Sequence, residues 1–221
     1  MIPQLSTLRR VVCALAISVV ATPAAGAQVS WTDWTSNDAN NVFGSMLFNG
    51  NPVGVTFSGL FDGAQFGCGT DYWVNPSIYT GVGVPNAPTN CEMIQLTAGS
   101  TKTITFSQAV TNPLFALISW NNQPVVTFNG PLEIVNQGCG YWGCGTMTVN
   151  GNVLNSVGES HGTIRLLGTY TEVTFTDGTE SWHGITVGAE ELATAPEPAS
   201  YVLMATGLLG VFGVSRRKRL R

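Results

Sequence analysis

The chain has 221 residues, which is enough for one main domain once both ends are set aside. Its 26 glycines and few charged residues favour sheets joined by tight turns over helices. Between Gln28 and Ala195 there are two cations and twelve acids, so this span carries a charge near −10. A surface this acidic repels nucleic acid, which we exclude as a partner.

The N-terminus has the pattern of a secretory signal peptide. Two arginines precede an apolar segment from Val11 to Val20, and Ala25-Gly26-Ala27 fits an A-x-A cleavage site. We predict a signal peptide over residues 1–27, cleavage between Ala27 and Gln28, and export through the Sec translocon. A leucine before the arginine pair disfavours a twin-arginine signal, and Cys13 lies too early for a lipoprotein signal.

Residues 28–188 show no convincing amphipathic helix, and short β-favouring runs recur between turn residues instead. The pattern predicts an all-β ectodomain, an antiparallel β-sandwich with a jelly-roll-like arrangement. Residues 189–195 are expected to be a linker. The expected strands are Val53–Phe57, Lys102–Phe106, Leu114–Trp120, Val125–Phe128, Leu132–Val135, Thr146–Val149, Gly162–Leu167, Glu172–Thr176 and Ile185–Val187.

The span 37–90 is less regular, and we expect long loops around one or two strands there, where binding residues usually lie. Four cysteines remain after export, and an even number in an exported protein indicates two disulfides. We favour the local pairs Cys68–Cys91 and Cys139–Cys144 among the three connectivities. A four-cysteine zinc site is the alternative, but the C-x₄-C spacing does not fit it.

Six tryptophans are many for this length, and most should fill the core. Trp73 and Trp142 lie in glycine-rich segments bounded by cysteines, so we expect both to be exposed. Exposed aromatic rings on a sandwich can stack on sugar rings, which makes these two residues the candidates for ligand binding.

The chain has two histidines, each followed by glycine. In an extended strand Glu159 and His161 share one side, and His183 lies on a later strand. The three residues could form an acid/base pair or hold a metal. We favour hydrogen bonding at a turn instead, and we expect no catalytic residue, no metal and no cofactor. The Asp-Gly pairs at Asp62 and Asp177 are turn signals first, since no calcium-loop spacing surrounds them.

The C-terminal end combines three features in fixed order. Pro196-Glu197-Pro198 is followed by an uncharged apolar run from Ala199 to Val214 and by five cations within residues 216–221. We predict a membrane helix over about 199–215. Its 16-residue apolar run reaches roughly 24 Å, short of a ~30 Å hydrocarbon core unless the arginines snorkel. The basic tail belongs in the cytoplasm, which places the ectodomain in the periplasm.

This order of features, within residues 195–221, resembles the PEP-CTERM sorting signal of Gram-negative bacterial surface proteins. A plain membrane anchor is the alternative. The resemblance implies that exosortase is the processing enzyme and that the sorting motif is Pro196, Glu197 and Pro198. Residues 158–188 also look like the final strands of several PEP-CTERM ectodomains, with a Gly-Glu-x-His-Gly turn and a closing Gly-Ile-x-Val-Gly.

The resemblance implies an exported, non-catalytic protein of the cell surface or matrix, linked to exopolysaccharide and biofilm. It would be held in the inner membrane before processing near residues 196–198. A carbohydrate-binding module is the first alternative, and a hydrolase using Glu159, His161 and His183 is the second.

Overall fold

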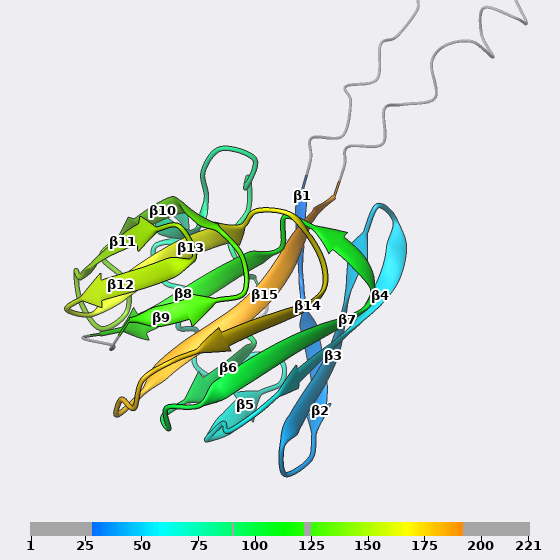
Figure 1. The fold of residues 1–221 in the computed structure, drawn as a ribbon, viewed down its shortest axis with the longest axis horizontal. Helices are drawn as coiled ribbons and strands as arrows, with labels where there is room; N and C mark the ends of the chain where they lie inside the picture. The colour runs from blue at the N-terminus through cyan, green and yellow to red at the C-terminus, as the bar shows by residue number, and fades with distance from the viewer. Residues whose placement is uncertain (1–27, 90, 122–124, 192–221) are drawn as a thin grey trace, which may run out of the picture.

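The computed structural model describes residues 28–89, 91–121 and 125–191, which form two packed antiparallel sheets (Figure 1). The predicted all-β class with two antiparallel sheets is confirmed, whereas the jelly-roll-like arrangement stays a prediction. The expected signal peptide (1–27) and C-terminal sorting segment (196–221) lie outside the described residues. Within the described ranges, no helix is long and apolar enough to cross a membrane.

Fifteen strands and one short 3₁₀ helix make up the described part of the chain. They are β1 (Gln28–Trp31), β2 (Asp33–Asn37), β3 (Asn41–Phe48), β4 (Asn51–Ser58), β5 (Gly63–Gln65), η1 (Pro76–Tyr79), β6 (Met93–Leu96), β7 (Thr101–Thr111), β8 (Leu114–Trp120), β9 (Val126–Phe128), β10 (Leu132–Gly138), β11 (Thr146–Asn150), β12 (Val153–Val157), β13 (Ser160–Leu166), β14 (Thr169–Thr176) and β15 (His183–Glu191).

The two sheets are assembled by repeated crossing of the chain between them. Sheet A has the order β10-β13-β8-β15-β6-β5, with β1 also paired to β15, and sheet B has the order β11-β12-β9-β14-β7-β4-β3-β2. From β12 onward each successive strand enters the other sheet. Strands far apart in the sequence are therefore neighbours, so the pairing is mostly non-local.

Side chains from the facing sides of the two sheets form the inter-sheet core. In β7 the alternate residues Ile104 and Phe106 point into this core, and the polar residues between them point towards solvent, as in any half-buried strand. On sheet A, β8 contributes Phe115, Leu117 and Trp120 to this core. At about 25 cal/mol per Å² of apolar surface, burial here is the main source of stability.

A second hydrophobic cluster, which we call the outer core, covers the opposite face of sheet A. The irregular segment between β5 and β6 supplies Trp73, Ile78, Tyr79, Val84 and Ala87 to it. Leu114, Ala116 and Ile118 of β8 face this cluster. Because β8 is covered on both sides, all seven of its residues are buried, which explains its continuous apolar sequence.

The structure corrects two expectations about the limits of the strands. The N-terminal part of the span 37–90 is a regular hairpin, in which β4, at the expected strand Val53–Phe57, pairs with β3 across the two-residue turn Asn49-Gly50. Both turn residues have positive φ, as a type I′ hairpin needs, and Asn-Gly is the sequence signal for it. At the other end, β15 continues to Glu191 and pairs with β1, so residues 189–191 are strand rather than linker.

Candidate functional site: a polar and aromatic end of the sandwich

The candidate residues gather at the end of the sandwich where β15 begins. The structure joins the predicted cysteine pairs, Cys68–Cys91 and Cys139–Cys144. It separates the two histidines, however: His183 packs against Trp120 in the inter-sheet core, with ring centroids 5.0 Å apart. His161 lies under the Cys139–Cys144 ring, where a Cβ added at Gly140 would collide with its imidazole. The structure therefore gives Glu159, His161 and His183 two different environments.

His183 belongs to an interior polar cluster with Lys102 and Asp177. The Lys102 Nζ lies 2.5 Å from Asp177 Oδ1, and the His183 Nε2 lies 3.0 Å from Asp177 Oδ2. All three side chains are fully buried. The Lys102 ammonium also donates to the Ala98 carbonyl at 2.9 Å and to Ser100 Oγ at 3.1 Å. Lys102 comes from sheet B and His183 from sheet A, so this cluster ties the two sheets together.

The charges within the interior polar cluster support one another. Burial by itself raises the pKa of Asp177, but hydrogen bonds from His183, Lys102 and the Ser100 backbone outweigh it and hold the pKa below its usual value. Burial lowers the pKa of Lys102, and the Asp177 carboxylate opposes that shift. The Lys102 ammonium, the His183 Nε2 and the Ser100 N–H all hydrogen-bond to this carboxylate, which is what a buried ion pair needs to persist.

His161 lies beside a β-bulge in β8 and hydrogen-bonds to it. Between the pairs Trp120–Ser160 and Leu117–Gly162, β8 has one residue more than β13, and Ser119 has a positive φ of 57°. The bulge takes the Ser119 N–H out of the ladder, and His161 Nδ1 accepts it at 3.3 Å. His161 therefore hydrogen-bonds to backbone, but at a bulge within strand β8 and not at a turn as predicted.

The position of His161 determines its charge and its chemistry. Burial lowers the pKa of His161 to about 4, and Glu159 only partly opposes this. An imidazolium could not accept the Ser119 N–H, so the bond requires the neutral ring. The Ser119 hydroxyl donates to Glu159 instead of His161. These three residues therefore lack the hydroxyl-to-imidazole hydrogen bond on which nucleophilic catalysis by serine depends.

Four aromatic residues from three separate segments form a surface cluster beside these polar groups, which we call the aromatic cluster. Its members are Tyr72, Tyr141, Trp142 and Trp182. Neighbouring ring centroids lie 4.8–6.1 Å apart in edge-to-face or tilted contact. Trp142 is 54% exposed, as predicted, and Tyr141 is 40% exposed.

The expected exposure of Trp73 is wrong. This side chain is only 2% exposed, because it belongs to the outer core, where its ring meets Tyr79 edge to face at 5.2 Å. A buried ring cannot stack on a ligand. Tyr72, Tyr141 and Trp182 were not predicted as members of the site. For Tyr72 and Tyr141, the available signal was their position next to Trp73 and Trp142. Which of two neighbouring rings points outward is decided only by the tertiary fold.

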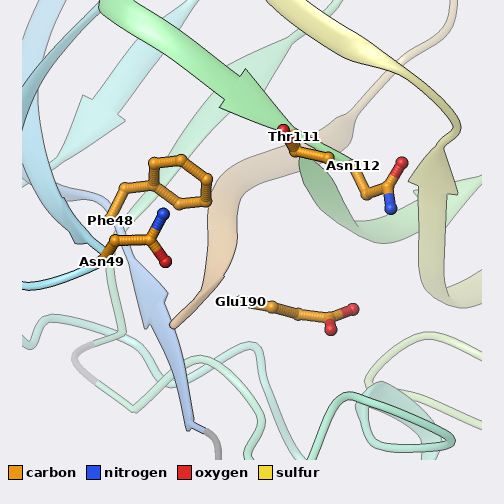
Figure 2. A pocket seen from close by; sticks show the side chains of 5 residues that line it. All are labelled: Phe48, Asn49, Thr111, Asn112 and Glu190. Atoms are coloured by element: carbon orange, nitrogen blue, oxygen red, sulfur yellow. The ribbon is translucent and has the colours of Figure 1, made fainter. Parts of the chain in front are cut away.

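The described residues offer few other sites. Among residues 28–89, 91–121 and 125–191, no three His, Cys, Asp or Glu side chains are grouped so that they could hold a metal ion. A cavity of about 230 Å³ lies at the other end of β15, lined by Phe48, Asn49, Thr111, Asn112 and Glu190 (Figure 2). The Glu190 carboxylate is already paired with Arg165, so this cavity does not offer a free charge.

Comparison with known families concerns the segment that follows the described sandwich. A family model described as the PEP-CTERM protein-sorting motif matches residues 194–218. The chain carries a PEP-CTERM sorting signal. This motif is typical of exported proteins whose membrane-anchored C-terminal signal is processed by exosortase, and it covers the three residues Pro196, Glu197 and Pro198. No curated protein and no solved structure matches the chain.

Proposed function

We propose that this PEP-CTERM protein is a non-catalytic component of the cell surface or extracellular matrix, linked to exopolysaccharide. The sorting motif at residues 194–218 carries this proposal. The sandwich fits an oxidising extracellular compartment, because two disulfides close its outer segments. Sec exports the chain, the inner membrane holds it with the ectodomain in the periplasm, and exosortase then processes it near residues 196–198.

A non-catalytic role is consistent with the separation of the candidate catalytic residues. His183 is engaged in the interior by Asp177, whereas His161 is engaged by the Ser119 backbone. A hydrolase using Glu159 with both histidines would need them to converge on one substrate. A carbohydrate-binding module remains the second candidate function, favoured by the exposed ring of Trp142.

The sorting proposal is tested by the variant Glu197→Ala in cells with and without exosortase. We expect the variant to stay in the membrane fraction at its unprocessed mass, because the substitution removes the only charge of the Pro-Glu-Pro tripeptide. Cell fractionation and intact mass of the recovered protein measure this outcome. Glu191→Ala is the matched control, since Glu191 precedes the motif at the end of β15. Normal release of the Glu197→Ala variant would contradict the sorting role.

A further inference from the structure

The aromatic cluster joins three segments that the fold brings to one place. Tyr72 lies in the loop closed by Cys68–Cys91, and Tyr141 and Trp142 lie in the ring closed by Cys139–Cys144. Trp182 ends the loop between β14 and β15. The Tyr72 centroid lies 5.0 Å from both Tyr141 and Trp182, so this ring connects the other segments.

The segments that bear these rings are held in place before any ligand arrives. The side-chain amide of Asn75 donates to the Cys139 carbonyl at 2.8 Å and so ties the two disulfide loops to each other. A tight turn closes the smaller ring, with the Gly140 N–H bonded to the Gly143 carbonyl at 2.8 Å. Fixed aromatic faces lose little conformational entropy on binding, which favours stacking with a ligand.

Hydrogen-bond acceptors lie beside the exposed rings. The Cys139–Cys144 ring packs directly on Glu159, since a Cβ added at Gly143 would lie 3.0 Å from the Glu159 Cβ. The Asn121 side chain donates to Glu159 at 2.6 Å, and its backbone N–H donates to Glu180 at 3.3 Å. The Glu180 carboxylate is only 9% exposed and lies against the interior, with its Oε2 3.4 Å from His183 Nδ1, so Glu159 is the acceptor nearest the exposed rings. An aromatic face next to a fixed carboxylate matches a ligand that presents C–H faces and hydroxyl donors together.

The charge of the domain narrows the class of ligand. Both of its cations are engaged, because Lys102 is buried against Asp177 and Arg165 pairs with Glu133 and Glu190. With a net charge near −10 over residues 28–195, the domain repels polyanions and also a second copy of itself. A neutral polysaccharide has the required hydroxyl groups and is not repelled by the acidic domain.

The aromatic cluster lies at the opposite end of β15 from Glu191. Trp182 immediately precedes β15, and the signal follows the end of β15. The strand has nine residues, so its two ends are separated by roughly 26 Å at the usual rise per residue. The first described residue, Gln28, pairs with Glu191 at the signal end. The cluster therefore lies at the end of the sandwich opposite to Gln28 and Glu191, the residues nearest the two ends of the described domain.

We propose that Tyr72, Tyr141, Trp142 and Trp182 form a binding site for neutral polysaccharide, with Glu159 accepting hydrogen bonds from sugar hydroxyls. This proposal rests on the proposed function, since it names the exopolysaccharide class that the surface protein would hold. In this site the sugar rings would stack mainly on Trp142, because its ring is the most exposed of the four.

The test uses the purified full chain in detergent with its disulfides intact, so that failed sorting in cells does not affect the result. Affinity electrophoresis in gels containing dextran, mannan, xylan or hydroxyethyl cellulose measures binding to neutral polymers, and alginate serves as the anionic polymer. We expect retardation by at least one neutral polymer and none by alginate. Trp142→Ala should weaken binding about tenfold or more, and Trp142→Phe should retain most of it.

Phe43→Ala is the matched control, because Phe43 is an exposed aromatic residue on β3 of sheet B, outside the cluster. Its binding should equal that of the unchanged protein. The proposal is overturned if no neutral polymer retards the protein, if alginate alone does, or if Trp142→Ala binds as well as the unchanged protein. A dimer that dissociates on Trp142→Ala, seen by light scattering without polysaccharide, would also overturn it.

Discussion

The inter-sheet core and the outer core stabilise opposite faces of sheet A in different ways. Regular strands supply the inter-sheet core, and in its interior polar cluster Asp177 pairs with both Lys102 and His183, whose Nδ1 lies 3.4 Å from Glu180 Oε2. An irregular segment supplies the outer core, and two disulfides hold the loops around it. The regular strands therefore form the base, and the loops around the outer core carry the exposed aromatic rings.

The loop between β14 and β15 connects the two regions. Its first residue, Asp177, points into the inter-sheet core, and its last residue, Trp182, joins the aromatic cluster. The buried ion pair therefore fixes one end of the loop that carries a proposed ligand-binding ring. Substitutions in the two cores should therefore lower stability, whereas substitutions of exposed rings in the aromatic cluster should affect binding more than stability.

The largest effect is expected from Lys102→Met in the inter-sheet core. The change leaves the Asp177 carboxylate buried without its ammonium partner, so unfolding free energy should fall by about 3–5 kcal/mol. Urea unfolding at pH 7 measures it. Adding Asp177→Leu should recover part of the loss because it removes the second buried charge. Arg165→Met is the control, whose ion pairs are partly exposed, with an expected loss of about 1 kcal/mol or less. Equal losses for Lys102→Met and Arg165→Met would refute this view of the cluster.

In the outer core, Trp73→Ala should lower the unfolding free energy by about 3–4 kcal/mol, because the deleted ring leaves a cavity against Tyr79. Trp142→Ala should change it by no more than about 0.5 kcal/mol, since that ring is half exposed. The same unfolding experiment compares the two variants. If Trp142→Ala is the more destabilising, then the assignment of Trp73 to packing and Trp142 to the surface is wrong.

A smaller effect should appear in the pH dependence of stability. The folded pKa of His161 is about 4 and its ordinary value is 6.5, so the unfolded chain binds more protons between these values. The contribution of neutral His161 is complete above pH 6.5 and is lost as pH falls towards 4, by about 3 kcal/mol. His161→Asn keeps an acceptor near the Nδ1 position but does not titrate. Unfolding measured from pH 7 to pH 4 should show a flatter profile for this variant, and identical profiles would argue against a buried neutral histidine.

Much of the sandwich could be predicted from local sequence patterns. The alternation in β7 and the apolar run of β8 identified strands whose positions the structure confirms. β1, β2, β5, β6 and β12 were missed, because they are short or have mixed polar composition. β1, β5 and β6 pair only with strands that are distant in the sequence, whereas β2 and β12 each pair with the adjacent strand, β3 and β11. β3 was also missed, although Asn49-Gly50 ahead of the predicted strand Val53–Phe57 was a usable signal for a hairpin.

The candidate site was less predictable than the strands, because its contacts join residues that are distant in the sequence. Local spacing suggested the two disulfides and the exposure of Trp142. It gave no information on whether Trp73 turns into the outer core. Nor could it place Lys102 against Asp177, since 75 residues separate them in the sequence. Contacts of that kind depend on sheet order.

The sequence by itself determined the all-β class and the sorting signal, because strand alternation and the order of the C-terminal features are local properties of the chain. Only the tertiary structure decided which of the two similar histidines is interior and which aromatic side chains face solvent. Burial depends on which distant strands and loops cover a residue. Tyr72, Trp142 and Trp182 meet because three loops end at the same edge of one sandwich.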